Sequence, residues 1–178
     1  VEGLNGVQVL RQDNAGQPAA LNHALGHATG ELLAFNDADD LWTPGRLTAQ
    51  LAALDEDPAL EAVFGQVEQF AEADAPAGVV AGLTEERRTQ PSRLHTAMLI
   101  RRPAFDRIGP FNAALRIAGV VEWAERASRA GLRERMLTDV VLRRRLHDAN
   151  IGLQQRDAAR ADYLAMARAA LARRRAQS

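Results

Sequence analysis

The sequence predicts an α/β layered domain with a mainly parallel sheet, because strand-like and helix-like segments alternate along it. Short apolar runs of strand length alternate along the chain with segments whose apolar residues repeat at helical spacing. The chain has 178 residues, of which 47% are hydrophobic, and this is enough to bury one core. We expect one domain over residues 1–153 and a carboxy-terminal helix with a basic end over residues 154–178.

The amino-terminal part is predicted to hold a strand followed by a helix. Val7–Leu10 is a short apolar run before a polar turn, which favours a strand. In residues 17–30, Pro18 occupies the first helical turn, apolar residues recur at helical spacing, and Gly30 marks the end. This pattern is typical of an amphipathic helix.

The remaining elements follow from the same rules. Residues 31–35 are predicted to form a buried strand, and Thr43, with Pro44 behind it, predicts the N-cap of a second helix. Further along we expect, in order, a strand at 62–69, a long loop at 71–93, a strand at 96–102, a short helix and turn at 103–111, a helix at 120–131 and a strand at 139–145.

Composition and charge exclude several classes of function. The formal net charge is −1, so overall charge gives no reason to expect binding to a nucleic acid. Cysteine is absent, which excludes disulfides and a cysteine nucleophile, and all 22 basic residues are arginine, which excludes chemistry that needs a lysine amine. No apolar run is long enough to cross a bilayer, and the first residues lack the basic and then apolar pattern of a signal peptide. We therefore expect a cytoplasmic protein.

An acidic group, Asp37, Asp39 and Asp40, follows the strand predicted at residues 31–35. Ligands of open α/β sheets bind at the carboxyl ends of strands, where these carboxylates are expected. Side chains at i and i+2 of an extended segment point the same way, so Asp37 and Asp39 can converge on a hard cation such as Mg²⁺ or Mn²⁺. Asp residues after a strand are also common turn formers and helix caps, and Asp40 suits that role.

Four segments stand in order along the chain: "NAGQPAALNHALGHATGELLAFNDADDLWTPGRL", "TAMLIRRPAFDRIGPFN", "EWAERASRAGL" and "RRRLHDAN". Together they resemble the family-2 nucleotide-sugar glycosyltransferases with the GT-A fold, from Leu10 to Gly152. The resemblance implies a GT-A-like, Rossmann-like domain with a mixed, mainly parallel sheet. It also implies that the domain is amino-terminally incomplete, because family members open with a strand and turn that hold the nucleotide base.

The resemblance implies a metal-dependent donor site. By position, Asp37 and Asp39 would form the D-x-D pair that binds Mn²⁺ or Mg²⁺, with Asp39 as the direct ligand and Asp37 nearer the ribose or the metal shell. His147 matches the histidine that completes the metal or diphosphate site in many members. An exposed loop histidine is the alternative interpretation of His147.

Further residues would contact the nucleoside-diphosphate sugar. Asn14, Gly16 and Asn22 fall where the family builds the wall of the sugar-nucleotide site. Arg143 and Arg145 would contact the diphosphate through forked donors, although an arginine row beside a strand also forms a solvated edge.

The reaction that the resemblance implies is inverting glycosyl transfer, in which the acceptor hydroxyl attacks the anomeric carbon opposite the leaving diphosphate. A carboxylate must take the acceptor proton, and we expect Glu122, directly before Trp123, to do so. Many relatives carry an acidic pair where this chain has Gly119 and Val120. The alternative role of Glu122 is an ion pair with Arg126 at i+4.

Two other functions stay open. Gly119 and Val120 favour a catalytically inactive GT-A-like domain that serves in binding or assembly. A phosphohydrolase that resembles the haloacid dehalogenases would also use D-x-D after a strand. That family needs a threonine within the motif and a later lysine, but Asp37 to Trp42 offers no threonine in place and the chain has no lysine.

The partners are predicted only by class. The resemblance implies a nucleoside-diphosphate sugar as donor and leaves the acceptor open among sugars, lipids, peptides and small molecules. The carboxy-terminal helix is expected to pack on the domain or on a second subunit of a homo-oligomer, with attachment to a membrane surface as the alternative.

Overall fold

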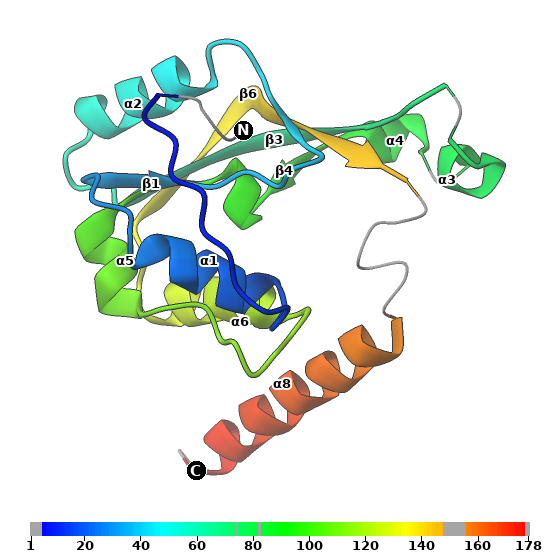
Figure 1. Ribbon diagram of the computed structural model, residues 1–178. Coiled ribbons are helices and arrows are strands. Elements are labelled where there is room, and N and C mark those ends of the chain that lie inside the picture. The colour runs from blue at the N-terminus through cyan, green and yellow to red at the C-terminus, as the bar shows by residue number, and fades with distance from the viewer. Residues whose placement is uncertain (1–4, 74, 82, 148–155, 177–178) are drawn as a thin grey trace.

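The computed structural model describes residues 5–73, 75–81, 83–147 and 156–176, and at its centre lies a mixed sheet (Figure 1). The strands are Leu32–Ala34 (β1), Leu41–Trp42 (β2), Ala62–Ala71 (β3), Thr89–Ser92 (β4), Leu99–Arg101 (β5) and Glu134–Leu146 (β6). The helices are Gln17–Leu25 (α1), Arg46–Glu56 (α2), Ala77–Ala81 (α3), Glu85–Arg88 (α4), Arg102–Ile108 (α5), Gly119–Arg129 (α6) and Arg156–Ala176 (α8), with a 3-10 turn at His95–Ala97 (η1).

In the described part of the chain, the strands are ordered β1-β5-β3-β6-β2, and β4 pairs with β3. Strands β3 and β6 are parallel, whereas the other four pairings are antiparallel. The mixed sheet of the prediction is confirmed, but the predominance of parallel pairing is wrong. The chain leaves β3 through α3 and α4 and returns to the edge of the same strand, as a hairpin does, so β4 and β5 both run against β3.

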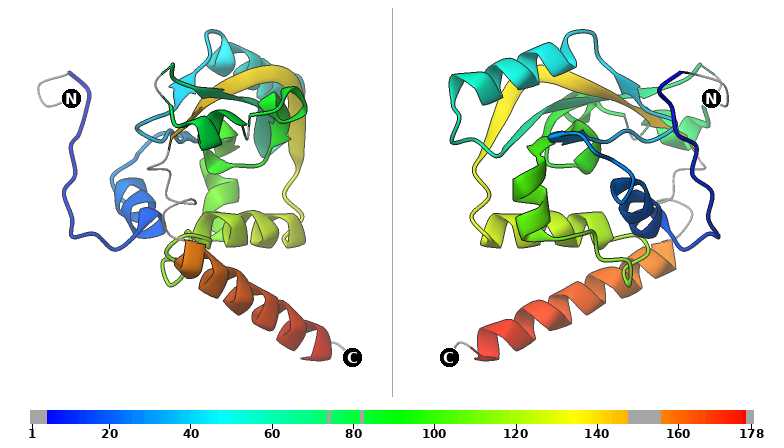
Figure 2. Two further views of the ribbon diagram at one scale, coloured as in Figure 1. Left: turned by 90° about the vertical axis from the view of Figure 1, so that its right-hand side faces the viewer. Right: turned by 60° about the vertical axis from the view of Figure 1, so that its left-hand side comes forward.

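Alternate residues of β3 point to opposite faces of the sheet and serve two cores. Ala62 and Phe64 belong to the main core, which includes buried residues of α5 and α6. Val63 packs with Ala53 and Leu54 of α2. Helix α2 therefore covers one face, and α5 and α6 lie on the other with α1 beside them (Figure 2).

Four aromatic rings hold α5 and α6 to the sheet: Phe35, Phe105, Phe111 and Trp123. Phe105 and Trp123 stack with their centroids 5.2 Å apart. The indole N–H of Trp123 donates to the carbonyl of Gly109 at 2.8 Å, so the buried polar atom has a partner. The helix that carries Glu122 is thereby fixed on the main core.

Two predictions in the amino-terminal part are wrong. Val7–Leu10 forms no strand, because its backbone is not paired with any described strand. Helix α1 ends at Leu25 rather than at Gly30. The guanidinium of Arg102 donates to the carbonyls of Ala28 and Gly30, both at 2.7 Å, and holds this connection outside the helix.

Two further predictions need correction. Helix α2 begins at Arg46 after Gly45, whose φ of 80° is left-handed. Thr43 does not cap it, because its hydroxyl donates to the carbonyl of Val140 at 2.5 Å. The segment 71–93, predicted as a loop, contains α3, α4 and β4, since β4 finds backbone partners along β3.

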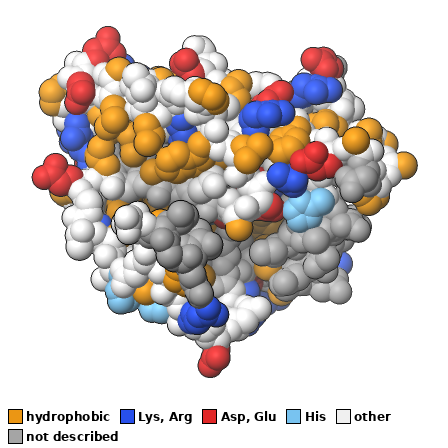
Figure 3. Space-filling model, turned by 45° about the horizontal axis from the view of Figure 1, so that its top comes forward, with side chains coloured by type: hydrophobic (Ala, Val, Ile, Leu, Met, Phe, Trp, Pro, Cys, Tyr) orange, Lys and Arg blue, Asp and Glu red, His pale blue; other side chains and the backbone are white. Residues whose placement is uncertain are grey.

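Large apolar side chains lie exposed over β2 and α2, among them Leu41, Trp42, Leu47 and Leu51 (Figure 3). The guanidinium carbon of Arg46 lies 4.2 Å from the ring centroid of Trp42. Exposed apolar side chains are common on folded domains, so this surface carries no functional conclusion by itself.

Helix α8 confirms the predicted carboxy-terminal helix and lies beyond α6, at the end of the molecule (Figure 1). The predicted boundary between residues 153 and 154 lies outside the described residues. Within the ranges that the structure describes, no helix is both long and apolar enough to cross a membrane.

Candidate functional site

The acidic turn, residues 36–40, connects β1 to β2. The amide of Asp40 donates to the carbonyl of Asp37 at 3.2 Å, and the side-chain amide of Asn36 donates to the carbonyl of Asp40 at 3.2 Å. Because β2 pairs with β6, the turn lies beside the last residues of β6.

Asp40 is the buried carboxylate of the acidic turn, with 7% of its surface exposed. Its Oδ1 accepts the backbone N–H of Arg145 at 3.0 Å, and Nε of Arg145 donates to the carbonyl of Asp39 at 3.1 Å. Burial raises the pKa of Asp40 to about 6; the N–H of Arg145 opposes this rise, whereas the charges of Asp37 and Asp39 add to it. Asp40 therefore joins the turn to β6, as a turn-forming residue would.

The raised pKa of Asp40 predicts a loss of stability as the pH rises. Because the pKa lies above its reference value of 3.8, the folded state holds the proton of Asp40 more tightly than the unfolded state does. The protonated carboxyl therefore contributes its full stability below about pH 4, and this contribution is lost as the pH rises to about 6. Between these two pH values the free energy of unfolding of the wild type should fall by on the order of 2 kcal/mol relative to that of Asp40→Asn. Urea unfolding across the range measures this difference.

The control for Asp40 is Asp55→Asn, because Asp55 is an exposed carboxylate on α2. This variant should keep the pH dependence of the wild type. If Asp40→Asn also kept it, the carboxyl of Asp40 would not titrate as the structure indicates.

Asp37 contacts residues of α1 and η1. Its Oδ1 accepts a hydrogen bond from Nε2 of Gln17 at 2.9 Å and lies 3.4 Å from Nε2 of His95. Burial alone would raise the pKa of Asp37, but the contact and charge of His95, with smaller effects of Gln17 and Arg144, outweigh burial and hold the pKa below its usual value. Asp37 is therefore ionised near neutral pH, with 36% of its side chain exposed.

His95 is a buried residue that the sequence interpretation missed. It is 6% exposed, and its ring lies against Phe35 and Phe111, with centroids 5.9 and 6.1 Å away. Among the described residues neither ring nitrogen has a partner at normal hydrogen-bond geometry. The ion-pair contact with Asp37 is therefore the polar contact that the structure gives this imidazole.

Asp39 and His147 lie together, as the resemblance implied. Oδ2 of Asp39 is 2.8 Å from Nε2 of His147, and both side chains are partly exposed. Carboxylate and imidazole are suitable ligands for Mn²⁺, and Mg²⁺ prefers the carboxylates. However, the described residues contain no group of three or more His, Asp, Glu or Cys side chains that could hold a metal ion, so the set of Asp37, Asp39 and His147 stays a prediction.

Arg143 and Arg145 each contact a carboxylate and the ring of Phe70. Nε of Arg143 donates to Glu68 at 2.8 Å, and Nη1 of Arg145 donates to Glu72 at 2.6 Å. The two guanidinium carbons lie 4.7 and 5.4 Å from the centroid of Phe70. These contacts agree with the alternative of a solvated edge, and a role at the diphosphate stays a prediction.

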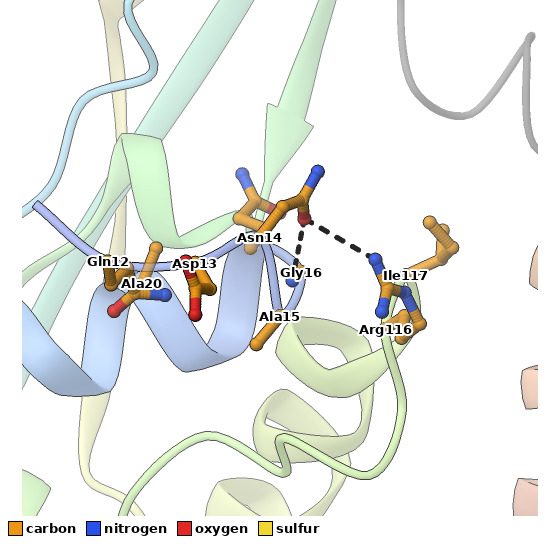
Figure 4. Close-up of a pocket in the computed structure, with 9 residues that line it drawn as sticks. Gln12, Asp13, Asn14, Ala15, Gly16, Ala20, Arg116 and Ile117 are labelled. Atoms are coloured by element: carbon orange, nitrogen blue, oxygen red, sulfur yellow. Dashed lines mark hydrogen bonds between the residues drawn. The ribbon is translucent and has the colours of Figure 1, made fainter.

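A cavity of about 330 Å³ adjoins the start of α1 and is lined by Gln12, Asp13, Asn14, Ala15, Gly16, Gln17, Ala20, Arg116 and Ile117 (Figure 4). Oδ1 of Asn14 accepts the N–H of Gly16 at 3.1 Å and contacts Nη2 of Arg116 at 3.4 Å. The φ of Gly16 is 90°, and a Cβ there would lie 3.2 Å from the carbonyl of Arg116. Because Gln17 lines this cavity and also binds Asp37, the cavity is joined to the acidic turn.

Asn22 does not line this cavity. Its Nδ2 donates to the carbonyl of Phe111 at 2.8 Å, and its Oδ1 accepts the N–H of the same residue at 3.0 Å. The amide thus holds α1 against the segment that precedes α6, and a contact with the sugar nucleotide stays a prediction.

Glu122 is paired with Arg126, which is the alternative that the i+4 spacing indicated. Oε2 lies 3.2 Å from Nη2 of Arg126. The same guanidinium donates to the carbonyls of Ile108 and Pro110 at 2.5 and 2.6 Å. Both carboxylate oxygens of Glu122 accept from this guanidinium, and the role of Glu122 as the base stays a prediction.

The chain belongs to glycosyl transferase family 2, because the sequence profile of that family matches residues 1–111. A shorter stretch of 47 residues is 45% identical to EpsE of Bacillus subtilis (strain 168), which is named as a glycosyltransferase. That match covers 26% of this chain and 17% of EpsE.

Solved structures of S. aureus TarS have the same fold. One has a TM-score of 0.57 and 18% identity, and a second, of residues 1–349 in complex with UDP, has a TM-score of 0.56 and 19% identity. Each similarity covers 78% of this chain, and 26% and 43% of the TarS chains. The predicted GT-A-like fold is confirmed, and the chain spans less than half the length of these relatives.

Proposed function

We propose that this protein transfers a sugar from a nucleoside-diphosphate sugar to an acceptor. The observation that carries the proposal is the acidic turn, in which Asp39 meets His147 from the end of β6 in a chain that belongs to glycosyl transferase family 2. The UDP complex of a TarS structure with the same fold supports a nucleoside diphosphate as part of the donor. The proposal includes inversion at the anomeric carbon and dependence on a metal ion.

In this proposal Asp39 and His147 would hold Mn²⁺ or Mg²⁺, and Asp37 would complete the negative surface beside them. The ion would supply positive charge to the leaving diphosphate. Gln17 and His95 hold one oxygen of Asp37, so this carboxylate keeps its direction and its charge. Arg145 keeps the turn in place through the carbonyl of Asp39.

Metal binding can be tested without turnover, through the titration of Asp40. The charges of Asp37 and Asp39 contribute to its raised pKa, so a cation bound between them and His147 should lower it. We expect NMR of the Asp40 carboxyl to show a fall of about one pKa unit with saturating Mg²⁺. The same titration with Asp39→Asn should show little change, and an unchanged pKa in the wild type would contradict a metal at this turn.

A catalytically inactive domain is the second candidate, and the Glu122–Arg126 pair is the observation that favours it. Glu122→Gln separates the two functions, with Glu125→Gln as the control because Glu125 is exposed on the same helix. If Glu122 is the base, transfer to the acceptor should fall about 100-fold or more while donor affinity is kept. Donor binding with no transfer in either the wild type or the variants would favour the inactive domain. Family membership leaves the phosphohydrolase without support.

A further inference from the structure

We propose that Asp162 of α8 is a positioning residue that fixes the segment 115–118, and with it one wall of the cavity at the start of α1. The inference rests on the proposed function in one respect, because it takes this cavity as part of the donor site.

The carboxylate of Asp162 binds the backbone just before α6, a helix to which Asp162 does not belong. Its Oδ2 accepts the backbone N–H groups of Ile117 at 2.8 Å and of Ala118 at 3.0 Å. Both N–H groups lie directly before α6, which begins at Gly119. Asp162 therefore fixes the backbone that leads into α6 from 44 residues further along the chain, and its negative charge suits the amino-terminal end of that helix.

An apolar contact reinforces these hydrogen bonds one helical turn later along α8. Met166 is 9% exposed and packs with Leu115 and Ala118. Tyr163, Leu164 and Leu171 are at least half exposed instead. The face of α8 that carries Asp162 and Met166 is therefore the face that meets the segment 115–118.

The same segment forms part of the cavity wall. Arg116 and Ile117 line the cavity, and Arg116 contacts Asn14 across it (Figure 4). The backbone of Arg116 also lies so close to Gly16 that a Cβ there would be 3.2 Å from its carbonyl oxygen. A movement of the segment 115–118 would therefore change the position of both Arg116 and the turn at Gly16.

Amide hydrogen exchange followed by NMR on the whole chain tests the inference. Asp162→Ala should accelerate exchange at Ile117 and Ala118 about fivefold or more, because both N–H groups lose a charged acceptor. The amide signal of Gly16 should also shift, because its neighbour Arg116 moves. Asp162→Asn should retain most of the protection, since its side-chain oxygen can accept the same hydrogen bonds. Leu164→Ala, on the exposed face, is the control and should change neither readout.

Two results would overturn the inference: unchanged exchange at residues 117 and 118 in Asp162→Ala, or faster exchange there with an unchanged Gly16 signal. Titration with UDP adds a separate readout, in which Asp162→Ala should bind about threefold or more weakly than Leu164→Ala. If the wild type bound no nucleoside diphosphate, the proposed function would fail, whereas the exchange data would still decide the role of Asp162. Should Asp162→Ala not fold, Asp162→Asn decides in its place: its neutral oxygen is a weaker acceptor, so exchange at residues 117 and 118 should be somewhat faster than in Leu164→Ala, and equal exchange in the two variants would overturn the inference.

Discussion

Arg46→Met should lower the free energy of unfolding by about 3 kcal/mol or more. Arg46 is 2% exposed, and its guanidinium donates to the carbonyls of Thr96 at 2.6 Å and Met98 at 3.2 Å. Its Nε donates to Gln50 at 3.1 Å. Methionine fills similar space but leaves these buried oxygens without their donor, and each unpaired polar group costs about 1–3 kcal/mol.

Urea unfolding measures this loss, and Arg129→Met is the control because Arg129 is exposed at the end of α6. The control should change stability by no more than about 0.5 kcal/mol. Burial lowers the pKa of Arg46 to about 10, so the side chain is still charged at neutral pH. A stability loss in Arg46→Met no greater than in Arg129→Met would show that the buried carbonyls find other donors.

Arg46 also bears on the candidate site, because Thr96 follows His95 in η1. Loss of the hydrogen bond to the carbonyl of Thr96 should loosen the support of His95 beneath Asp37. We therefore expect the pKa of Asp37 to move back toward its ordinary value in any Arg46 variant that folds.

Gly119→Ala should destabilise the domain by about 3 kcal/mol, because no room exists for a side chain at this position. A Cβ on Gly119 would lie 2.4 Å from the carbonyl oxygen of Asn112 and 2.7 Å from Cγ of Pro18. Helix α6 would have to move away from α1. Gly78→Ala is the matched control, since nothing lies within 4 Å of its Cβ position, and it should be neutral or slightly stabilising.

The contacts of Gly119 also leave no room for an acidic side chain at this position. An aspartate at residue 119 could not occupy the structure described here, so Gly119→Asp should unfold the domain more readily rather than add a base. Thermal unfolding of Gly119→Asp beside Gly119→Ala checks this. A stable Gly119→Asp variant would contradict the close packing of α6 on α1.

The sequence predicted those features that depend on neighbours in the chain. The helix at residues 120–131 follows from its apolar spacing and from Gly131, and α6 lies there. The role of Asp40 as a turn former follows from its position after a strand. The Glu122–Arg126 pair follows from the i+4 spacing on one helix.

Contacts between distant segments were not predictable in this way. Nothing near His95 in the sequence indicates that η1 lies beneath Asp37, which depends on the pairing of β1 with β5. Asp162 binds the backbone before α6, and a single Asp within a helical pattern gives no sign of such a partner. The predominance of parallel strands was wrong for a similar reason, because β4 is a short polar segment that is extended through its pairing with β3.

The most direct test of the central claim is the release of nucleoside diphosphate from a panel of sugar nucleotides in the presence of Mn²⁺ or Mg²⁺. The wild type, Asp39→Asn and the exposed-site control Asp55→Asn are compared at equal protein concentration. We predict release by the wild type and by Asp55→Asn, and a loss of about 100-fold or more in Asp39→Asn. Equal rates in Asp39→Asn and Asp55→Asn, or no release by the wild type with any sugar nucleotide, would contradict the account.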